Sequence, residues 1–501
     1  MTRTSTTTNN PSSAQSPPAA AGRPAHSGVI APACIAAALL AMVALILAAF
    51  RFADHDMFHQ MALAKAAIEL GHVPRDDLFA FTPTLSPVVH HEWGMGFILH
   101  GLWQLAGLHA VAALRIMLVA AILALTTLTA RRRGASWGII AATMPLGLLF
   151  LSAGISPVRA QLFTLVFLAA QLLFMDLDRR GIKWWVPLWL LLLIPWLNIH
   201  GGFVVGPAIL ALHWLEQVAR TRKPQWHLIA AGLAAVPLML INPYGTDFVR
   251  YLFSAVTMPR GLISEWAPLW TPGLRLELAA ASFSALITLY AALRKGWRTL
   301  PGLPVLLAAL VESFMHQRHL SILAVVWVAY VPGMLAGTPL DGLLARLWER
   351  RRALIAAGAF AATGACLFAL PAPPWRVELA TRDADAAAAV LPVHAADYLE
   401  RTRFTGNVLT PFNGSAYLSW RLWPDVKVSL DSRYEAAYSA EVVQDHMRFY
   451  AADGDWPDTL EKYNPDLVLT TTGSAIGELL TQHRWTTVHK DEAYVLLAPP
   501  D

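Results

Sequence analysis

The sequence contains few charged residues. Asp, Glu, Lys and Arg make up 14% of the 501 residues, whereas 56% are hydrophobic and the mean hydropathy is +0.46. Soluble globular domains contain about 25% charged residues, so this composition excludes an ordinary soluble protein and favours a polytopic membrane protein. The net charge of +4 is small, and the basic residues lie in short clusters between apolar runs. Such clusters report membrane topology, and we expect no nucleic-acid partner.

Cysteine is nearly absent as well. The two cysteines, Cys34 and Cys366, each lie inside an apolar run, which is typical of packed helix residues and not of a disulfide framework. The C-terminal part of the chain contains no zinc-ligand spacing, glycine-rich phosphate loop or nucleophile elbow. The enzyme classes that depend on those motifs are therefore excluded for that part.

The first 27 residues lack the apolar content that folding requires. Residues 1–27 are rich in Ser, Thr, Pro and Ala, so we predict a disordered cytoplasmic segment. The apolar run that follows, at 29–50, is longer than the roughly 7–15 apolar residues of a cleaved signal peptide. We therefore interpret this run as a retained membrane helix.

Apolar runs recur across residues 28–370, which we predict to form a transmembrane domain. A membrane-spanning helix needs about 20 apolar residues, and somewhat fewer where its ends are embedded in protein. The fold class that we predict is mainly α, a polytopic membrane helix bundle with interfacial helices. Its predicted spans, eleven in all, are 29–50, 108–130, 135–152, 160–175, 184–198, 203–219, 226–242, 278–293, 301–315, 319–336 and 353–370.

The run 92–107, "EWGMGFILHGLWQLAG", does not fit this series. It is short, and it contains His100, Trp103 and Gln104. We predict an interfacial helix here, because all the basic clusters then fall on the cytoplasmic side together with the N-terminus. The polar motifs and the C-terminal part then lie outside, which predicts a multi-pass protein of the cell inner membrane with a periplasmic C-terminal domain. The basic clusters are "RRR", "RRGIK", "RTRK", "RKGWR" and "RLWERRR".

The composition changes after Pro371. We predict a linker at 371–394 and a small extracytoplasmic α/β domain at 395–501. Helical patterns at 395–402 and 474–483 alternate there with short β-rich runs such as "NVLTPF", "VKVSLD" and "DLVLTTT", and the segment "WTTVHKDEAYVLLAP" predicts a final strand pair. This alternation is typical of a small α/β domain.

The most polar strand end of this domain is "SLDSR", residues 429–433. We expect a structural pair of Asp431 with Arg433 there, and a ligand site is the alternative. The domain itself either binds a substrate, covers the membrane site or only stabilises the protein.

Ionisable residues follow the first apolar run, in "ADHDMFHQ". Charged groups at a membrane boundary are costly to desolvate. Asp54 and Asp56 can share a divalent cation with hydroxyl or phosphate groups, or one can act as a general base on a sugar hydroxyl. The alternative is a helix end that meets water, although the helix dipole disfavours acids there. His55 and His59 have the i, i+4 spacing that suits zinc, but two histidines alone favour interfacial residues.

The motif "HHEW" supplies His90, His91 and Glu92 at the start of the interfacial helix. Glu92 is either the N-terminal acid of that helix or a second acid that faces the same cavity as Asp54. The two histidines are candidate pocket residues.

Two arginines, Arg159 and Arg318, lie between apolar runs on the predicted outer side. A guanidinium forms bidentate hydrogen bonds with phosphate. The alternative is that each arginine extends to the membrane interface, but nearby polar residues favour a site for an anionic lipid headgroup. The nearby candidates are Gln161, His200, His316 and His319.

The order of these motifs resembles the GT-C superfamily of integral membrane glycosyltransferases, including its protein mannosyltransferase-like and aminoarabinose transferase-like branches. More closely, "DHDMFHQ", "GHVPRDDLFAFT" and "HHEW" are similar to a group of bacterial GT-C-like proteins. The motifs "HGG" and "NPYG" and the segment "GSAYLSWRLWPDVKVSLDSR" also match that group. The resemblance covers most of residues 30–500, although the pair Asp54 and Asp56 departs from the Asp-Glu pair of the mannosyltransferases.

The resemblance implies an inverting transfer of sugar from a polyprenyl-phosphate donor to a hydroxyl of a lipid, glycan or protein acceptor. Asp54 would take the acceptor proton, and Asp56 and Glu92 would complete the catalytic acids. The donor phosphate would contact Arg159, His200, Arg318 and His319, and the lipid chain would lie in a groove between helices. A divalent cation would fit such a site but is not required.

Two other functions remain open from the sequence. The first is a non-catalytic transporter or assembly component for lipid-linked glycans or exopolysaccharide. Internal repeats and acids at mid-membrane would favour it, but the sequence shows no clear repeat and its polar motifs gather at one face. The second is a membrane hydrolase with zinc bound by residues chosen from His55, His59, His90 and His91.

Overall fold

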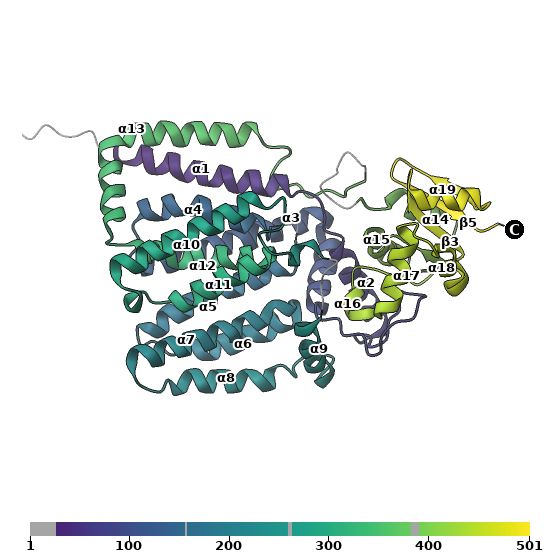
Figure 1. Cartoon of the computed structure of the whole chain (residues 1–501), viewed down its shortest axis with the longest axis horizontal. Helices are drawn as coiled ribbons and strands as arrows, with labels where there is room; N and C mark the ends of the chain where they lie inside the picture. The colour runs from purple at the N-terminus through teal and green to yellow at the C-terminus, as the bar shows by residue number, and fades with distance from the viewer. Residues whose placement is uncertain (1–26, 156–157, 259–262, 382–389, 501) are drawn as a thin grey trace, which may run out of the picture.

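The protein is elongated, with a helical bundle at one end and a smaller α/β unit at the other (Figure 1). The predicted disordered segment 1–27 lies outside the described residues except for Ser27, and the predicted linker 371–394 is described in part. The predicted fold class is confirmed, since the described residues are mainly helical and end in a small mixed sheet. The computed structural model describes residues 27–155, 158–258, 263–381 and 390–500.

Within these residues, seven helices are long and apolar enough to cross a membrane, and shorter apolar helices run beside them (Figure 1). Each predicted span corresponds to one of these helices. The long ones are α1 (Ser27–Ala49), α3 (Trp93–Arg132), α5 (Gln161–Arg179), α7 (Val205–Thr221) with η1 (Gly201–Val204), α10 (Arg275–Lys295), α12 (Leu320–Leu335) with η4 (Gln317–His319), and α13 (Pro339–Phe368). The shorter ones are α4 (Trp137–Ser152), α6 (Trp185–Ile199), α8 (Trp226–Leu238) and α11 (Leu303–Met315).

Two of the long helices are interrupted. Non-helical dihedral angles at Ala106 and Gly107 divide α3, where Gly107 has φ +56° and ψ −139°. This break separates the segment predicted as an interfacial helix, 92–107, from the span that follows it. A second interruption at Arg351 divides α13, and the part after it corresponds to the predicted span 353–370.

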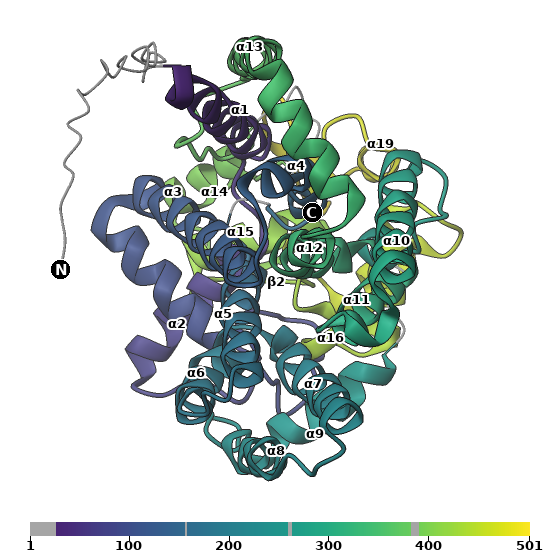
Figure 2. The same ribbon diagram turned by 90° about the vertical axis from the view of Figure 1, so that its left-hand side faces the viewer.

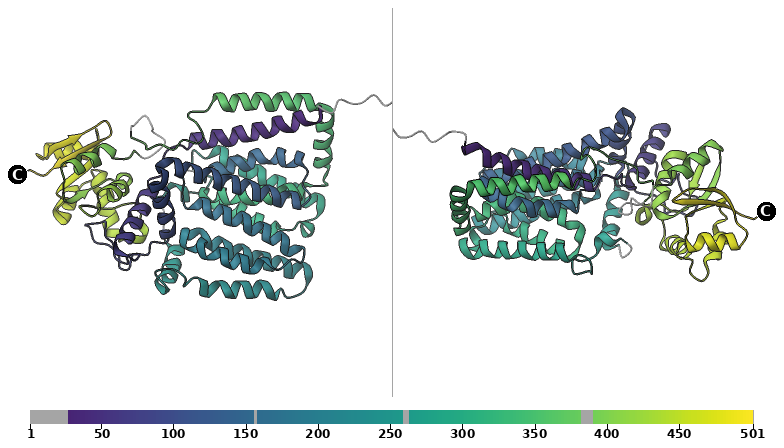
Figure 3. Two further views of the ribbon diagram at one scale, coloured as in Figure 1. Left: turned by 180° about the vertical axis from the view of Figure 1, so that it is seen from behind. Right: turned by 90° about the horizontal axis from the view of Figure 1, so that it is seen from above.

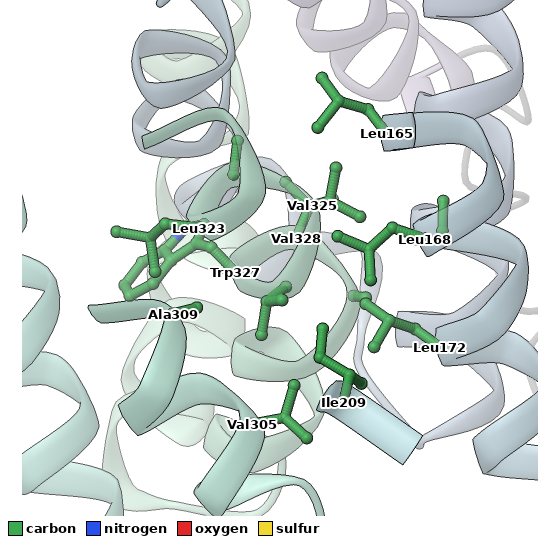
Figure 4. Packing of buried hydrophobic residues seen from close by; sticks show 14 of the residues in the cluster. Leu165, Leu168, Leu172, Ile209, Val305, Ala309, Leu323, Val325, Trp327 and Val328 are labelled. Carbon is green, nitrogen blue, oxygen red and sulfur yellow. The ribbon is translucent and has the colours of Figure 1, made fainter. Parts of the chain in front are cut away.

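The bundle is built around α12, which lies near its middle when viewed along the helices (Figure 2). Its sequence is apolar on all sides, and nearly every residue of α12 is buried, as expected of a helix enclosed by others. Trp327 and Val328 pack here with Leu168 of α5 and Val305 of α11 (Figure 4). A Cβ atom on Gly147 of α4 would clash with Val328, so a glycine allows α4 to approach α12 closely.

Short elements that the sequence analysis did not predict surround the end of the bundle nearest the α/β unit. They are α2 (Asp56–Leu70), α9 (Thr246–Thr257) and η2 (Ser264–Trp266). Most of α2 is buried, and it packs between α3 and α15 (Phe412–Leu422) of the α/β unit. Because protein and not lipid covers its apolar side chains, α2 lacks the long apolar run that marks a span.

The α/β unit contains a five-stranded sheet of order β2-β1-β3-β5-β4. Strand β1 pairs in parallel with β2 and β3, whereas β5 is antiparallel to β3 and β4. The predicted strands and the final strand pair are all present, as β1 (Gly406–Leu409), β2 (Val426–Val428), β3 (Leu467–Thr471), β4 (Thr486–Lys490) and β5 (Tyr494–Ala498). The helices are α14 (Val393–Arg401), α15, α16 (Tyr434–Ala437), α17 (Ala440–Tyr450), α18 (Trp456–Tyr463) and α19 (Ala475–Gln482).

The first loop of the bundle extends this sheet. Phe81 donates a backbone hydrogen bond to Val428 at 3.0 Å, and Val428 donates one to Phe79 at 2.9 Å, so the loop runs parallel to the edge strand β2. An unpaired strand edge is thereby covered. The views from behind and from above show the unit at the same end of the bundle (Figure 3).

The helix directions divide the loops between the two ends of the bundle (Figure 1). The loops after α1, α4, α6, α8 and α11 lie at the end that carries the α/β unit. All the basic clusters lie at the opposite end, in the loops after α3, α5, α7 and α10 and in the first half of α13.

Candidate active site

A cavity of about 910 Å³ lies where the bundle meets the α/β unit. Its walls come from α2, the starts of α3 and α5, η1, α9, η2, η4 and the α/β unit. Two sequence-predicted site residues, Asp54 and His316, are absent from its lining. The others line it together: Asp56, His90, His91, Glu92, Arg159, Gln161, His200, Arg318 and His319.

Asp54 lies behind the cavity wall and holds Arg159. Its Oδ2 accepts a hydrogen bond from Arg159 Nε at 2.7 Å, and its Oδ1 accepts one from the backbone N–H of Asp56 at 3.0 Å. Arg159 also forms an ion pair with Glu265. Although burial opposes it, the charges of Asp54, Asp56 and Glu265 raise the pKa of Arg159 well above its usual value. Arg159 is therefore a permanent positive charge at the cavity.

Asp56 is the first-loop carboxylate that faces the cavity. Burial alone would raise its pKa, but the charges of His55, Arg159 and His59 and a hydrogen bond from Ser432 lower it to about 2. Asp56 is thus ionised at neutral pH. A group with so low a pKa is a weak proton acceptor.

The pKa of Glu92 is shifted in the opposite direction to that of Asp56. Burial and the nearby charge of Asp56 raise the pKa of Glu92 to about 8, although Arg318, Gln60 and Arg159 act in the other direction. Its carboxylate accepts a hydrogen bond from Gln60 Nε2. Glu92 Oε1 lies 3.5 Å from Nε2 of His200 and 3.7 Å from Nε2 of His91.

The side chain of Glu92 does not cap the helix that it precedes. It forms no capping hydrogen bond with α3 and instead lines the cavity. Two glycines of the motif "EWGMG" allow this placement. A Cβ on Gly94 would lie 2.8 Å from the carbonyl oxygen of Asn198, and a Cβ on Gly96 would clash with the carbonyl oxygen of Gln60. The start of α3 therefore fits closely between α2 and the end of α6.

A hydrogen-bond chain orients His200. Trp196 Nε1 donates to Thr164 Oγ1 at 2.8 Å, and Thr164 Oγ1 lies 2.8 Å from His200 Nδ1, which also accepts from the backbone N–H of Gly202 at 3.2 Å. Because Nδ1 accepts, the neutral ring carries its proton on Nε2, toward Glu92. Burial and the charge of Arg318 lower the pKa of His200 well below its usual value, which keeps the ring neutral.

The second arginine, Arg318, also lines the cavity. The Arg318 guanidinium lies 4.8 Å from the centre of the Trp266 ring. His316 Nδ1 lies 2.9 Å from the carbonyl oxygen of Trp266, so His316 supports this wall from behind. Gln161 donates to Ser321 Oγ at 2.8 Å, and His319 lies 3.3 Å from Glu312.

His90 and His91 differ in their surroundings. Within the described chain His90 Nε2 has no hydrogen-bond partner, and burial together with the charge of Arg433 lowers the pKa of His90 well below its usual value. His91 Nδ1 lies 3.0 Å from the hydroxyl of Tyr251, and the two rings stack.

The α/β unit contributes cavity residues that the sequence analysis did not assign: Phe412, Asn413, Ser432, Arg433, Ala436 and Met447. The predicted Asp431–Arg433 pair is present at 2.6 Å, and it flanks Ser432. The sequence signal for this contribution was the strand end "SLDSR".

A cation would compete with Arg159 at the first loop. Asp54, His55 and Asp56 offer one ligand atom each within 4.8 Å of one another. Both carboxylate oxygens of Asp54 already accept hydrogen bonds, one of them from a guanidinium. The residues therefore fit a divalent cation poorly. Among the described residues, His55, His59, His90 and His91 do not form a group whose ring nitrogens could hold one metal ion.

The fold has a counterpart among solved structures. Among solved structures, the chain resembles the Archaeoglobus fulgidus oligosaccharyltransferase, crystallised with a disulfide-tethered acceptor peptide containing the NVT sequon. The TM-score is 0.55 at 14% sequence identity, and the match covers 88% of this chain and 69% of that chain. No family model matches the sequence, and no curated protein matches it.

Proposed function

We propose that the protein is a glycosyltransferase that moves a sugar from a polyprenyl-phosphate donor to an acceptor hydroxyl. The observation that carries this proposal is the convergence of Asp56 and Glu92 with Arg159 and Arg318 around one cavity. The likeness to an oligosaccharyltransferase supports a membrane glycosyltransferase. The acceptor is a lipid, a glycan or a protein, and the surrounding membrane lipids hold the donor chain.

The reaction takes place at the outer face of the cytoplasmic membrane. The basic clusters lie at the bundle end opposite the cavity, and positively charged loops favour the cytoplasmic side. The N-terminus is then cytoplasmic, and the α/β unit is periplasmic.

The two arginines bind and stabilise the donor phosphate. Arg159 is fixed by Asp54 and Glu265, and Arg318 is fixed against Trp266. Preoriented guanidinium groups favour the charge that develops on a leaving phosphate. His200 and His319 line the same cavity and add neutral polar contacts to the phosphate.

The proton acceptor is Glu92. Asp54, which the resemblance indicates as the base, does not line the cavity, and both of its carboxylate oxygens accept hydrogen bonds. Its role as base is a prediction that this geometry does not favour. Asp56 faces the cavity with a pKa lowered to about 2, whereas Glu92 has a pKa raised to about 8. Carboxyl groups whose environments separate their pKa values in this way commonly divide the catalytic roles.

The proposed reaction is a single displacement. The acceptor O–H proton passes to Glu92, and the acceptor oxygen forms a bond with the anomeric carbon. The bond between that carbon and the phosphate oxygen breaks, and its electron pair leaves with the polyprenyl phosphate. Asp56 stays ionised and stabilises positive charge on the sugar ring. Glu92 then loses its proton to water.

A transporter is not favoured by the buried charges of the bundle. Asp176, Asp178 and Glu216 are buried, but each lies in the last turns of α5 or α7, away from the cavity. Each is paired with arginine or histidine, for example Arg179 with Glu216 at 2.8 Å and His213 with Asp178 at 2.9 Å. These pairs connect helices at that end of the bundle.

Acceptor-dependent release of polyprenyl phosphate tests the proposal. Purified protein in liposomes is given polyprenyl-phosphate sugars and candidate acceptors, and mass spectrometry follows both products. We expect release and glycosylated acceptor with the natural protein, and donor binding without release for Glu92→Gln. Donor movement across the membrane without any glycosylated product would favour the transporter instead.

A further inference from the structure

Ser432 belongs to the α/β unit but lies at the cavity beside α2. Its Oγ is 2.7 Å from Nδ1 of His59, and the Ser432 hydroxyl is one of the groups that lower the pKa of the nearby Asp56 carboxylate. An ionised carboxylate only accepts hydrogen bonds, so the Ser432 hydroxyl donates to Asp56. The same oxygen then accepts a hydrogen bond from the protonated Nδ1 of His59. One serine thus fixes both the carboxylate and the imidazole ring.

The two neighbours of Ser432 hold it in place. Arg433 donates to Asp431 with Nε at 2.9 Å and with a terminal nitrogen at 2.6 Å, and its other terminal nitrogen donates to Asp77 of the first loop. The side chains of Asp77, Asp431 and Arg433 are at most 4% exposed. Removal of one member of a buried ion pair leaves an uncompensated buried charge and is strongly destabilising. We call these three residues the Asp77–Arg433–Asp431 clamp.

The clamp joins the two parts of the protein at the cavity. Beside it, the first-loop residues 79–81 pair with β2 at the sheet edge. The loop that contains Asp77 and the strand end that contains Ser432 are therefore fixed to each other by backbone and side-chain bonds.

We infer that the C-terminal unit completes the active site by supplying Ser432 as a positioning residue for Asp56 and His59. The clamp fixes the position of Ser432. The kinetic consequence of this inference rests on the proposed function. Misplacement of a catalytic group by about 1 Å can reduce a rate by about 100-fold. Loss of the hydroxyl therefore lowers kcat, while the donor phosphate site at Arg159 and Arg318 is unchanged.

The kinetic test compares Ser432→Ala with Ser432→Thr in the full chain. We expect Ser432→Ala to lower kcat by about 10- to 100-fold with an unchanged KM for the donor, and Ser432→Thr to retain most activity because it keeps the hydroxyl. Asp77→Asn, which weakens the clamp from the other side, should also lower kcat. A matched control is Ser474→Ala, which removes the N-cap of α19 far from the cavity. Equal kcat for Ser432→Ala and this control would overturn the inference.

A cross-linking test does not require sugar transfer. Cys34 and Cys366 are first replaced by alanine, and cysteines are then introduced as His59→Cys and Ser432→Cys. A short bifunctional thiol reagent should join the pair in membranes, and Asp77→Asn should reduce the yield. Failure of the pair to cross-link would overturn the contact. Cross-linking of the pair, together with no sugar transfer by the natural protein, would instead contradict the proposed function and leave the contact confirmed.

Discussion

The pH dependence of transfer tests the role of Glu92. A base with a pKa of about 8 is about 9% ionised at pH 7 and about 91% ionised at pH 9, since each pH unit changes the ratio tenfold. If Glu92 accepts the proton, kcat/KM should rise about tenfold between these pH values. Asp56, whose pKa is about 2, would give a flat profile over the same range.

Protein stability gives a second measurement for the same residue. Glu92 has a folded-state pKa of about 8, above the usual 4.5. A raised pKa means that the folded protein binds the proton more tightly, so stability falls as pH rises from 4.5 to 8. The shift corresponds to at most about 5 kcal/mol. Glu92→Gln removes this effect. The thermal midpoint of the variant should therefore exceed that of the natural protein by a margin that grows as the pH rises from 4.5 to 8.

Donor turnover with a defined acceptor gives the pH–rate profile, and thermal denaturation in the same detergent gives the stability difference. A flat kcat/KM between pH 7 and pH 9, together with a pH-independent stability difference for Glu92→Gln, would refute the assignment of the base. Glu92→Asp is a useful companion, since it retains a carboxylate and should keep a rising profile at lower activity.

Three further predictions concern the same site. Gln60→Met removes a hydrogen bond that lowers the pKa of Glu92, so the rising limb of the pH–rate profile should move to higher pH; an unmoved limb would contradict this contact. Gly96→Ala introduces a clash between α3 and α2 and should lower the yield of folded protein, because overpacking costs about 1–3 kcal/mol. The control is Gly101→Ala, which should be neutral because a Cβ at Gly101 would meet no other atom within 4 Å. A chelator should leave transfer unchanged, because Arg159 occupies the carboxylate that a cation would need, and activity that returns only with added divalent cation would disprove this.

The helices of the bundle were predictable because lipid imposes a strong rule on the sequence. A helix that faces lipid must be apolar over its length, and α1 and α10, which are largely uncovered by other parts of the protein, satisfy this rule without knowledge of their neighbours. Helix α2 was missed because protein covers it, so no long apolar run was required. The boundary at 107 between the interfacial helix and the next span was predicted from the positions of the basic clusters, and the structure shows the non-helical backbone angles there.

The candidate site was predictable as a set of residue types but not as an arrangement. Asp54 and Asp56 are two residues apart, yet one holds Arg159 behind the wall and the other faces the cavity. The sequence left open whether Glu92 caps a helix, and the absence of a capping bond resolves this. Ser432 meets His59 across 373 positions of the chain, and such contacts depend on tertiary packing that no local pattern reports.

The most direct test of the account is a structure of the Glu92→Gln protein with a polyprenyl-phosphate sugar bound. We predict that the phosphate lies within hydrogen-bond distance of both Arg159 and Arg318. The acceptor side of the anomeric carbon should face residue 92, with Asp56 beside the ring. A donor phosphate bound elsewhere, for example among the arginines at the opposite end of the bundle, would contradict the proposed reaction site.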